Sequence, residues 1–433
     1  MERRRIGQQL ELVFESKSDQ AEWFGYYNYG VLNADQTKML CNRADVDGVA
    51  VEKGMSIELG YYDIVSGDWH HIGTSDSWNW QQGAMLQWLP RQKEDIAIYN
   101  SSQNGRLIAK IHNTTTGEER VINWPIYGIT PDGKKSISIE LERSYWCRAY
   151  HYMSVANPAM DGRVLDSDGI FEIDLEQNTR KRIISIQDII ACDYDSEFEK
   201  MKHWLEHVMI SPSGKRFCFL HRFSPIDNVY DYTTRVCIAN IDGTNLQVVS
   251  GWKKYNWSHF WWRTDDEFVI YTYENSRFGK LKSLHEIISE KPLSLKKLTQ
   301  RVSLNLSYKL PMPLGKLFGR GDSYYQYYTL SEEGLFRLKG KWANKHFRID
   351  GHPSFSEGGE FMITDTYPDK KGFQHLYRFN VKTHKLDDMA QLYAAFSGNS
   401  ASCDLHPKVS KNNFIAVDTA YDGRHHLLLF RSR

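Results

Sequence analysis

The chain has 433 residues, of which 41% are hydrophobic and 13% aromatic, so it can bury a large core. Lys and Arg together number 54, as do Asp and Glu, and this balance argues against a partner that is nucleic acid or a membrane. Six scattered cysteines and the lack of a long apolar stretch favour a reducing compartment, so we expect a cytoplasmic protein, or a periplasmic one if a signal peptide has been removed.

One pattern recurs along the chain: a short strand, a polar turn and a second strand. In chain order its copies are YGVLNADQTKMLCNR (29–43), MLQWLPRQKEDIAIYN (85–100), IYGITPDGKKSISIEL (126–141), HVMISPSGKRFCFLHR (207–222), HFWWRTDDEFVIYTY (259–273), GHPSFSEGGEFMITDT (351–366) and LHPKVSKNNFIAVDTA (405–420). Seven copies of one unit indicate a repeat architecture.

Most copies are followed by a second hairpin signature, an alternating strand with an Asp, Asn or Gly turn. These hairpins are expected at 55–73, 106–122, 169–185, 235–250 and 375–390. Two hairpins make a four-stranded antiparallel sheet, and seven such sheets predict an all-β, seven-bladed β-propeller over residues 1–433. The last copy has only three evident strands, so we expect the lone strand GQQLELVFES (7–16) to complete the last blade.

Three segments interrupt the repeat and are predicted to be insertions, at 142–168, 187–206 and 275–330. Within the second, DSEFEKMKHWLEH (195–207) predicts a helix with an acidic start. The first contains the aromatic run RSYWCRAYHY (143–152), which either packs across the ring or supplies tyrosines to a sugar-binding funnel.

Four copies carry a histidine at one register, four residues before the turn, whereas the other copies have Tyr29, Met85 and Ile126 there. A propeller places equivalent positions of its innermost strands around the central axis, so these imidazoles should face one funnel. They are His207, His259, His352 and His406. The alternative is that each histidine braces its own blade and takes no part in chemistry.

The string CDLH (403–406) adds metal-ligating side chains beside His406. With His352 from the adjacent blade, either Asp404 or Cys403 completes three ligands and leaves an open coordination position. Asp404 and His406 lie on the same side of an extended segment, which favours Asp404.

Several of these segments resemble the oligogalacturonate lyases and the related ulvan lyases, with the best match over about residues 200–275 and 350–430. They are HVMISPSGKRFCFLHR, RVCIANIDGTNLQVV, SHFWWRTDDEFVIY, GHPSFSEGG and LHP. The resemblance implies a seven-bladed propeller that cleaves a uronate-containing glycan by β-elimination. It also implies a divalent metal, for which Mn²⁺, Zn²⁺ and Ca²⁺ are candidates.

By position, the resemblance implies that Arg235 faces the substrate carboxylate and that His259 is the catalytic base. It likewise implies that His352 and His406 bind the metal. The chain departs from the family at Asp404, where the family has a histidine, and at Ala401, where the family has a glutamine. The expected metal site therefore has a carboxylate in place of an imidazole and one ligand fewer.

The sequence thus predicts a carbon–oxygen lyase whose partner is a uronate-containing oligosaccharide or polysaccharide. The expected catalytic residues are His259, Arg235, His207, His221 and Tyr150. The expected substrate-binding residues are Arg222, Arg143, Tyr152 and Tyr273. Two alternatives stay open: a non-catalytic propeller that binds a glycan or a protein, and a glycoside hydrolase that acts next to a uronic acid.

Overall fold

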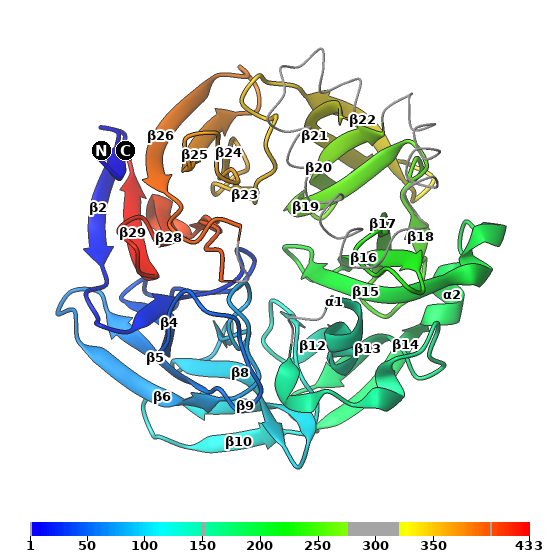
Figure 1. Ribbon diagram of the computed structural model, residues 1–433, viewed down its shortest axis with the longest axis horizontal. Helices are drawn as coiled ribbons and strands as arrows, with labels where there is room; N and C mark the ends of the chain where they lie inside the picture. The colour runs from blue at the N-terminus through cyan, green and yellow to red at the C-terminus, as the bar shows by residue number, and fades with distance from the viewer. Residues whose placement is uncertain (1, 149–151, 276–319, 399–400) are drawn as a thin grey trace.

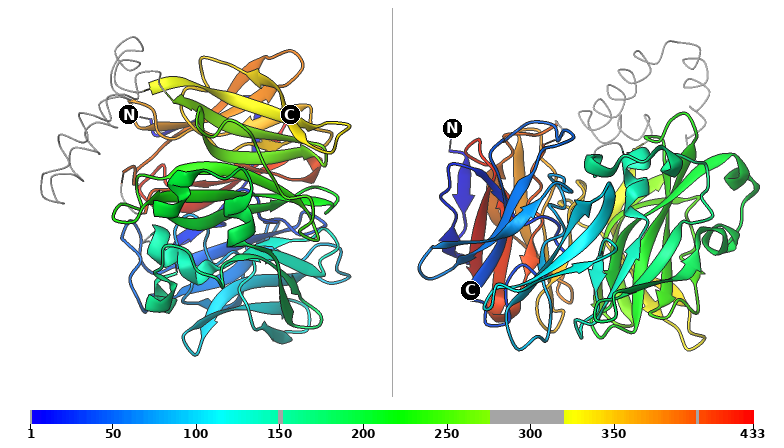
Figure 2. Two further views of the ribbon diagram at one scale, coloured as in Figure 1. Left: turned by 90° about the vertical axis from the view of Figure 1, so that its right-hand side faces the viewer. Right: turned by 90° about the horizontal axis from the view of Figure 1, so that it is seen from below.

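Seven antiparallel sheets stand around a central axis in the computed structural model, which describes residues 2–148, 152–275, 320–398 and 401–433 (Figure 1). The strands run between the two faces of the ring in the side views of Figure 2. The protein is an all-β, seven-bladed β-propeller, and this confirms the predicted fold class.

The first three blades each have four strands. Blade one contains β3 (Ala21–Trp23), β4 (Lys38–Ala44), β5 (Ile57–Asp63) and β6 (Trp69–Ser75). Blade two contains β7 (Gln87–Trp88), β8 (Ile96–Gln103), β9 (Arg106–Asn113) and β10 (Glu119–Ile122). Blade three contains β11 (Gly128–Ile129), β12 (Lys135–Ile139), β13 (Gly169–Asp174) and β14 (Thr179–Ser185).

The remaining blades follow in chain order. Blade four contains β15 (Met201–Ile210), β16 (Arg216–Pro225), β17 (Thr233–Asn240) and β18 (Gln247–Val248). Blade five contains β19 (Tyr255–Thr264), β20 (Glu267–Asn275), β21 (Arg320–Leu330) and β22 (Phe336–Trp342). Blade six contains β23 (Ser354–Phe355), β24 (Phe361–Thr364), β25 (Phe373–Asn380) and β26 (Leu386–Tyr393), and blade seven contains β27 (Lys408–Val409), β28 (Phe414–Thr419) and β29 (His426–Ser432).

The N-terminal segment closes the ring. β2 (Leu10–Glu15) pairs antiparallel with β29 and becomes the fourth strand of blade seven, as the sequence predicted. β1 (Arg4–Ile6), which was not predicted, pairs with β26 and gives blade six a fifth strand. The same segment therefore joins two neighbouring blades across the point where the ring closes.

The predicted insertions differ from the structure in two places. The helix expected over 195–207 is wrong, because Met201–Ile210 is strand β15, the innermost strand of blade four. Helical structure instead precedes it, in α2 (Ile186–Ala191) and the short 3₁₀ turn η4 (Ser196–Lys200). In the third insertion, Arg320–Leu330 is strand β21 of blade five, and residues 276–319 lie outside the described residues.

The insertion at 142–168 contains short helical turns in its described part. They are η1 (Leu141–Arg143), α1 (Ser144–Arg148), η2 (Met153–Val155) and η3 (Pro158–Met160), and another 3₁₀ turn, η6 (Lys411–Asn413), lies in blade seven. Among the described residues, no helix is both long enough and apolar enough to cross a bilayer.

Candidate functional site

The four histidines of the shared register lie together at the axis. Neighbouring ring centroids are 6.3 Å apart for His207 and His259, 4.0 Å for His259 and His352, and 4.4 Å for His352 and His406. They come from blades four to seven, on or just before the innermost strands β15, β19, β23 and β27. The structure thus brings together four imidazoles, of which the first and last are about 200 residues apart in the sequence.

Local backbone geometry turns two of these histidines toward the axis. His207 has a φ of 56° and His406 has a φ of 45°, a left-handed conformation that L-residues seldom adopt. The pairing of β15 with β16 also shifts register between Glu206 and Met209, which marks a bulge at His207. Strained backbone of this kind is concentrated at functional sites, because surrounding structure has to hold it in place.

Two tyrosines of blade one fill the centre of the ring beside the histidines. The Tyr26 ring stacks on His207 at 5.2 Å and meets His406 edge-on at 5.0 Å, and the Tyr27 hydroxyl donates to the carbonyl oxygen of Phe260 at 2.9 Å. The Asp418 carboxylate accepts the backbone N–H groups of Phe24 and Gly25, at 2.8 and 3.1 Å, and so anchors the loop that carries both rings. Blade seven therefore fixes the position of side chains from blade one.

A cavity of about 340 Å³ opens beside the histidines. Its lining residues lie on strands of blades three, four and five and on loops and helical turns between strands: Tyr26, Gln81, Gln82, Tyr127, Ile139, Leu141, Ser144, Arg148, Glu206, His207, Arg222, Tyr232, Ser258, His259, His352, Tyr367, Ser402 and Asp404. The wall combines titratable side chains with aromatic rings, which is typical of a small-molecule site.

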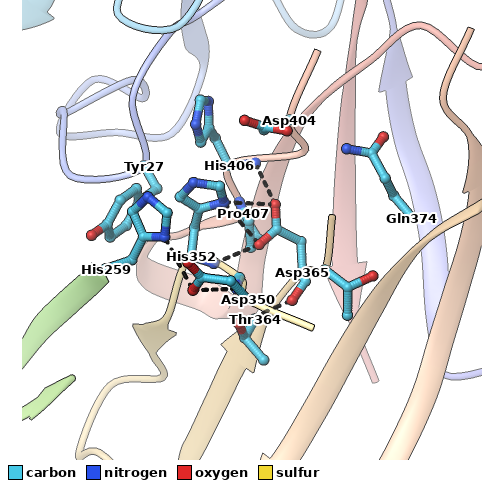
Figure 3. Close-up of polar contacts among 12 residues, drawn as sticks. Tyr27, His259, Asp350, His352, Thr364, Asp365, Gln374, Asp404, His406 and Pro407 are labelled. Carbon is cyan, nitrogen blue, oxygen red and sulfur yellow. Dashed lines mark hydrogen bonds and ion pairs between the residues drawn. The ribbon is translucent and has the colours of Figure 1, made fainter. Parts of the chain in front are cut away.

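His352, Asp404 and His406 form a cluster whose ligand atoms all lie within 4.8 Å of one another (Figure 3). The Asp365 carboxylate holds the imidazole of His352, whose Nδ1 lies 3.0 Å from it, and the backbone of His406, whose N–H it accepts at 3.1 Å. A carboxylate on one ring nitrogen leaves the other nitrogen of His352 for a metal, the usual arrangement of a metal-bound histidine.

The charge state of this cluster suits a cation. Burial lowers the pKa of both His352 and His406 well below the ordinary value, so both rings are neutral and can act as ligands. Burial, followed by the nearby Asp365 charge, raises the pKa of Asp404 well above its ordinary value. Nε2 of His406 is buried and finds no hydrogen-bond partner among the described residues. Two neutral imidazoles and one carboxylate group fit a divalent ion such as Mn²⁺ or Zn²⁺.

His259 is held by a second network. Its Nδ1 lies 3.3 Å from the Asp350 carboxylate (Figure 3). The same nitrogen lies 3.1 Å from the Ser258 hydroxyl, and the Tyr273 hydroxyl donates to Asp350 at 2.8 Å. Burial alone would raise the pKa of Asp350, but the His259 imidazole and these hydrogen bonds bring it below the ordinary value. The contacts engage Nδ1 of His259 and leave Nε2 as the nitrogen that can act on a ligand.

The other side of the cavity is an arginine corner formed by Arg148, Arg222, Glu206 and Tyr232. Nη1 of Arg222 lies 2.6 Å from the Glu206 carboxylate, and Nε of Arg148 lies 3.5 Å from it. Both guanidinium carbons lie over the Tyr232 ring, at 4.5 Å for Arg222 and 5.5 Å for Arg148. The Arg222 charge lowers the pKa of the Tyr232 phenol, because it stabilises the phenolate.

Three of the predicted site residues lie away from the cavity. His221 faces the interior of blade four, where its Nε2 is 2.9 Å from Nδ1 of His203. Arg235 is fully buried beside it and donates to the carbonyl oxygens of Ile189 and Cys192. Arg143 is also buried and donates to the backbone carbonyl oxygens of Met160, Gly162 and His203. The roles predicted for these three residues in catalysis and substrate binding do not fit their positions.

The predicted tyrosines also occupy supporting positions. Tyr152 is buried, and its hydroxyl donates to the Gln82 side chain at 3.2 Å. Tyr273 acts on His259 through Asp350. Tyr150 lies outside the described residues.

Sequence reasoning missed Glu206, Arg148, Tyr232 and Tyr367, all of which line the cavity. Tyr367 lies near the histidines, with its ring centroid 6.2 Å from His259 and 5.8 Å from His352. Two of these residues could have been found from the sequence. Glu206 directly precedes a histidine of the shared register, and Tyr367 directly follows the Asp365-Thr366 end of the blade-six copy.

The sequence matches no protein-family model, and no curated protein matches it. The chain shares the fold of an oligogalacturonate lyase. That protein, from Vibrio parahaemolyticus, is 13% identical, with a TM-score of 0.59 over 99% of this chain and 97% of that one. The Kuenenia stuttgartiensis hydrazine synthase (9% identical, TM-score 0.48, 95% and 96% covered) and a Pseudomonas aeruginosa periplasmic gluconolactonase (9%, 0.41, 84% and 85%) are also similar. At such identities the likeness extends to the fold alone.

Proposed function

We propose that the protein is a lyase that cleaves a uronate-containing glycan by β-elimination at the axial cavity. The observation that carries this proposal is the position of His259, aligned by Asp350, beside the His352, Asp404 and His406 cluster, since the rings of His259 and His352 are 4.0 Å apart. The reaction requires a base beside a group that neutralises a carboxylate, and the cavity offers both.

The proton that is removed lies on C5 of the uronate, next to the carboxylate. It becomes acidic only when the carboxylate charge is neutralised, and a divalent ion held by His352, Asp404 and His406 would supply that neutralisation when bound. Nε2 of His259 accepts the C5 proton, and Asp350 stabilises the imidazolium that forms through its contact with Nδ1.

The bond between C4 and the glycosidic oxygen then breaks as a double bond forms between C4 and C5. The departing oxygen needs a proton, and Tyr232 is the cavity phenol best suited to give one, because the Arg222 charge lowers its pKa. The aromatic wall, with Tyr26, Tyr127 and Tyr367, offers flat apolar faces on which a sugar ring can pack.

The test is to incubate the protein and a divalent ion with a panel of uronate glycans and to follow the ultraviolet absorbance of the unsaturated product. His259→Ala should abolish the signal, and Asp350→Asn should lower kcat by about 10-fold or more with little change in KM, because the imidazole loses its alignment. His71→Ala, on the exposed face of β6, serves as the control.

Full activity of the His259→Ala variant would remove His259 from the mechanism. Cleavage that gives a saturated product would indicate hydrolysis, since hydrolysis leaves no double bond, and would overturn the lyase assignment.

A further inference from the structure

Three aromatic side chains stack on one another where the propeller closes. The imidazole of His425, which is 1% exposed and directly precedes β29, lies between the rings of Trp80 and Phe396. Its centroid is 4.6 Å from that of Trp80, at an interplanar angle of 20°, and 5.0 Å from that of Phe396, at 10°. Trp80 follows blade one, Phe396 follows blade six and His425 belongs to blade seven. This three-ring stack therefore joins three separate parts of the chain.

Three consecutive residues of blade one, which follow β4, hold the stack, one residue for each ring. The Asp47 carboxylate lies 2.5 Å from Nδ1 of the imidazole and accepts the backbone N–H of the same histidine at 2.9 Å. The backbone of Gly48 packs on the phenyl ring, since a Cβ atom there would lie 2.6 Å from it. The carbonyl oxygen of Val49 accepts the indole N–H at 2.7 Å. An imidazole that is bonded to a carboxylate and packed between two rings has a fixed orientation.

On one side, the stack reaches the axial cavity through Gln81, which directly follows Trp80 in the chain. The Gln81 side chain lines the cavity and donates to the carbonyl oxygen of Ser402 at 2.9 Å. It is also a hydrogen-bond donor to the Asp404 carboxylate. Trp80 thus sets the position of a side chain that holds Asp404 and its neighbouring backbone.

On the other side, the stack holds the connection that carries Asp404. Phe396 and Asp404 both lie on this connection, which runs from β26 to β27, and residues 399–400 between them lie outside the described residues. After these two residues, Ala401 is fully buried and belongs to the same hydrophobic cluster as Trp80. The connection is therefore fixed to the stack or to its surroundings on both sides of residues 399–400.

We propose that His425 is a positioning residue for the metal ligand Asp404 and that the segment 47–49 holds it in this role. This inference rests on the proposed function, and within it on the metal site. A metal ion needs its ligands at fixed distances, and removal of a group that holds a ligand in place typically lowers metal affinity by about 10- to 100-fold. Because His425 directly precedes β29, which pairs with β2, the closure of the propeller also sets the position of a ligand.

The experiment measures two quantities on the full-length protein: the dissociation constant of Mn²⁺ by calorimetric titration, and the unfolding temperature without the ion. Phe396→Ala removes one ring of the stack, is only partly buried and leaves all three ligands in place, so we expect the dissociation constant to rise by about 10-fold. Phe396→Tyr keeps the ring and should restore the wild-type value. His425→Ala removes the middle ring and should weaken binding at least as much as Phe396→Ala.

Tyr327→Ala is the matched control for loss of a stacked ring. Tyr327 is also partly buried and stacks on one ring, that of Trp342, at the same centroid distance of 5.0 Å, but this pair lies on the outer strands β21 and β22 of blade five. We expect Tyr327→Ala to lower the unfolding temperature about as much as Phe396→Ala does and to leave the dissociation constant of Mn²⁺ unchanged. The control therefore separates positioning of a ligand from general stability.

An unchanged dissociation constant in Phe396→Ala and His425→Ala would overturn the positioning role and leave the lyase assignment intact. An equal loss of affinity in Tyr327→Ala would also overturn it, because stability alone would then explain the effect. A wild-type protein that binds no ion would overturn it as well. If the wild type binds Mn²⁺ but cleaves no uronate glycan, the lyase assignment fails, whereas weaker binding in Phe396→Ala would still support the role of His425.

Discussion

Glu206 shows how one side chain links the cavity to the stability of the fold. Its carboxylate is buried between Arg148 and Arg222, with His207 nearby, and its pKa is well below the ordinary value when the chain is folded. A carboxyl with a lower pKa in the folded state contributes stability above the pKa of the unfolded chain, about 4.3. That contribution is lost as the pH falls through the folded pKa.

We therefore predict that the unfolding temperature of the wild type falls between pH 5 and pH 3 partly because of Glu206. Glu206→Gln should be less stable than the wild type at pH 7, since two guanidinium groups lose their counter-ion, and the gap should narrow toward pH 3. Thermal unfolding followed by circular dichroism at each pH gives the difference. A gap that does not change with pH would contradict the prediction.

Part of the site could be predicted residue by residue from the sequence. The four histidines were found because one register of a repeat maps onto one position around the axis. His221 and Arg222 were both assigned to the funnel, but consecutive residues of a strand point to opposite faces, and Arg222 alone lines the cavity. Arg235 pairs directly with His221 across β16 and β17, so it shares the face that looks away from the cavity.

Strand β2 shows how one strand contributes to the closure of the ring. Its pairing with β29 shifts register between Leu12 and Phe14, which marks a bulge, so these two residues do not keep the same-face spacing of a regular strand. Phe14 is 9% exposed and packs at 5.1 Å on Tyr62 of blade one, whereas Leu12 on the same strand is 37% exposed. The buried ring therefore contributes to the contact between the last blade and the first.

We predict that Phe14→Ala lowers the free energy of unfolding by about 3 kcal/mol, because it removes a buried ring and leaves a cavity between two blades. Leu12→Ala, two residues away on the same strand, should cost less than about 1 kcal/mol. Equilibrium denaturation with urea measures both. Similar values for the two variants would show that the closure of the ring does not depend on this contact.

The strands of the repeat could be predicted because alternating residues and turn residues mark each hairpin. The error over 195–207 arose because β15 is buried on both faces, so its apolar residues do not alternate and an acidic start resembles a helix. β1 is only three residues long and has no pattern of its own. Its position follows from the free edge of β26, which is a property of the folded ring.

At the scale of the whole molecule, the proposed metal site joins two blades. His352 precedes the inner strand of blade six, and Asp404 and His406 precede that of blade seven. An ion bound by all three would stabilise the folded ring relative to the unfolded chain, in which these residues are far apart.

We predict that Mn²⁺ or Zn²⁺ raises the unfolding temperature and that a chelator reverses the change. At 100 times the dissociation constant the gain in free energy is about 2.7 kcal/mol. His406→Ala should abolish the response, and His71→Ala should retain it. Elemental analysis of dialysed protein should give about one ion per chain for the wild type, and a response that survives in His406→Ala would contradict the proposed ligand set.

The closure of the ring by β1 and β2 determines when the last two blades can be completed during synthesis. Both strands are synthesised long before β26 and β29, their partners in blades six and seven. Until those partners emerge from the ribosome, the first strands have nothing to pair with, and the two blades that contribute His352 and His406 are unfinished. The nascent chain therefore completes the wall of its axial cavity only at the final step of its own assembly.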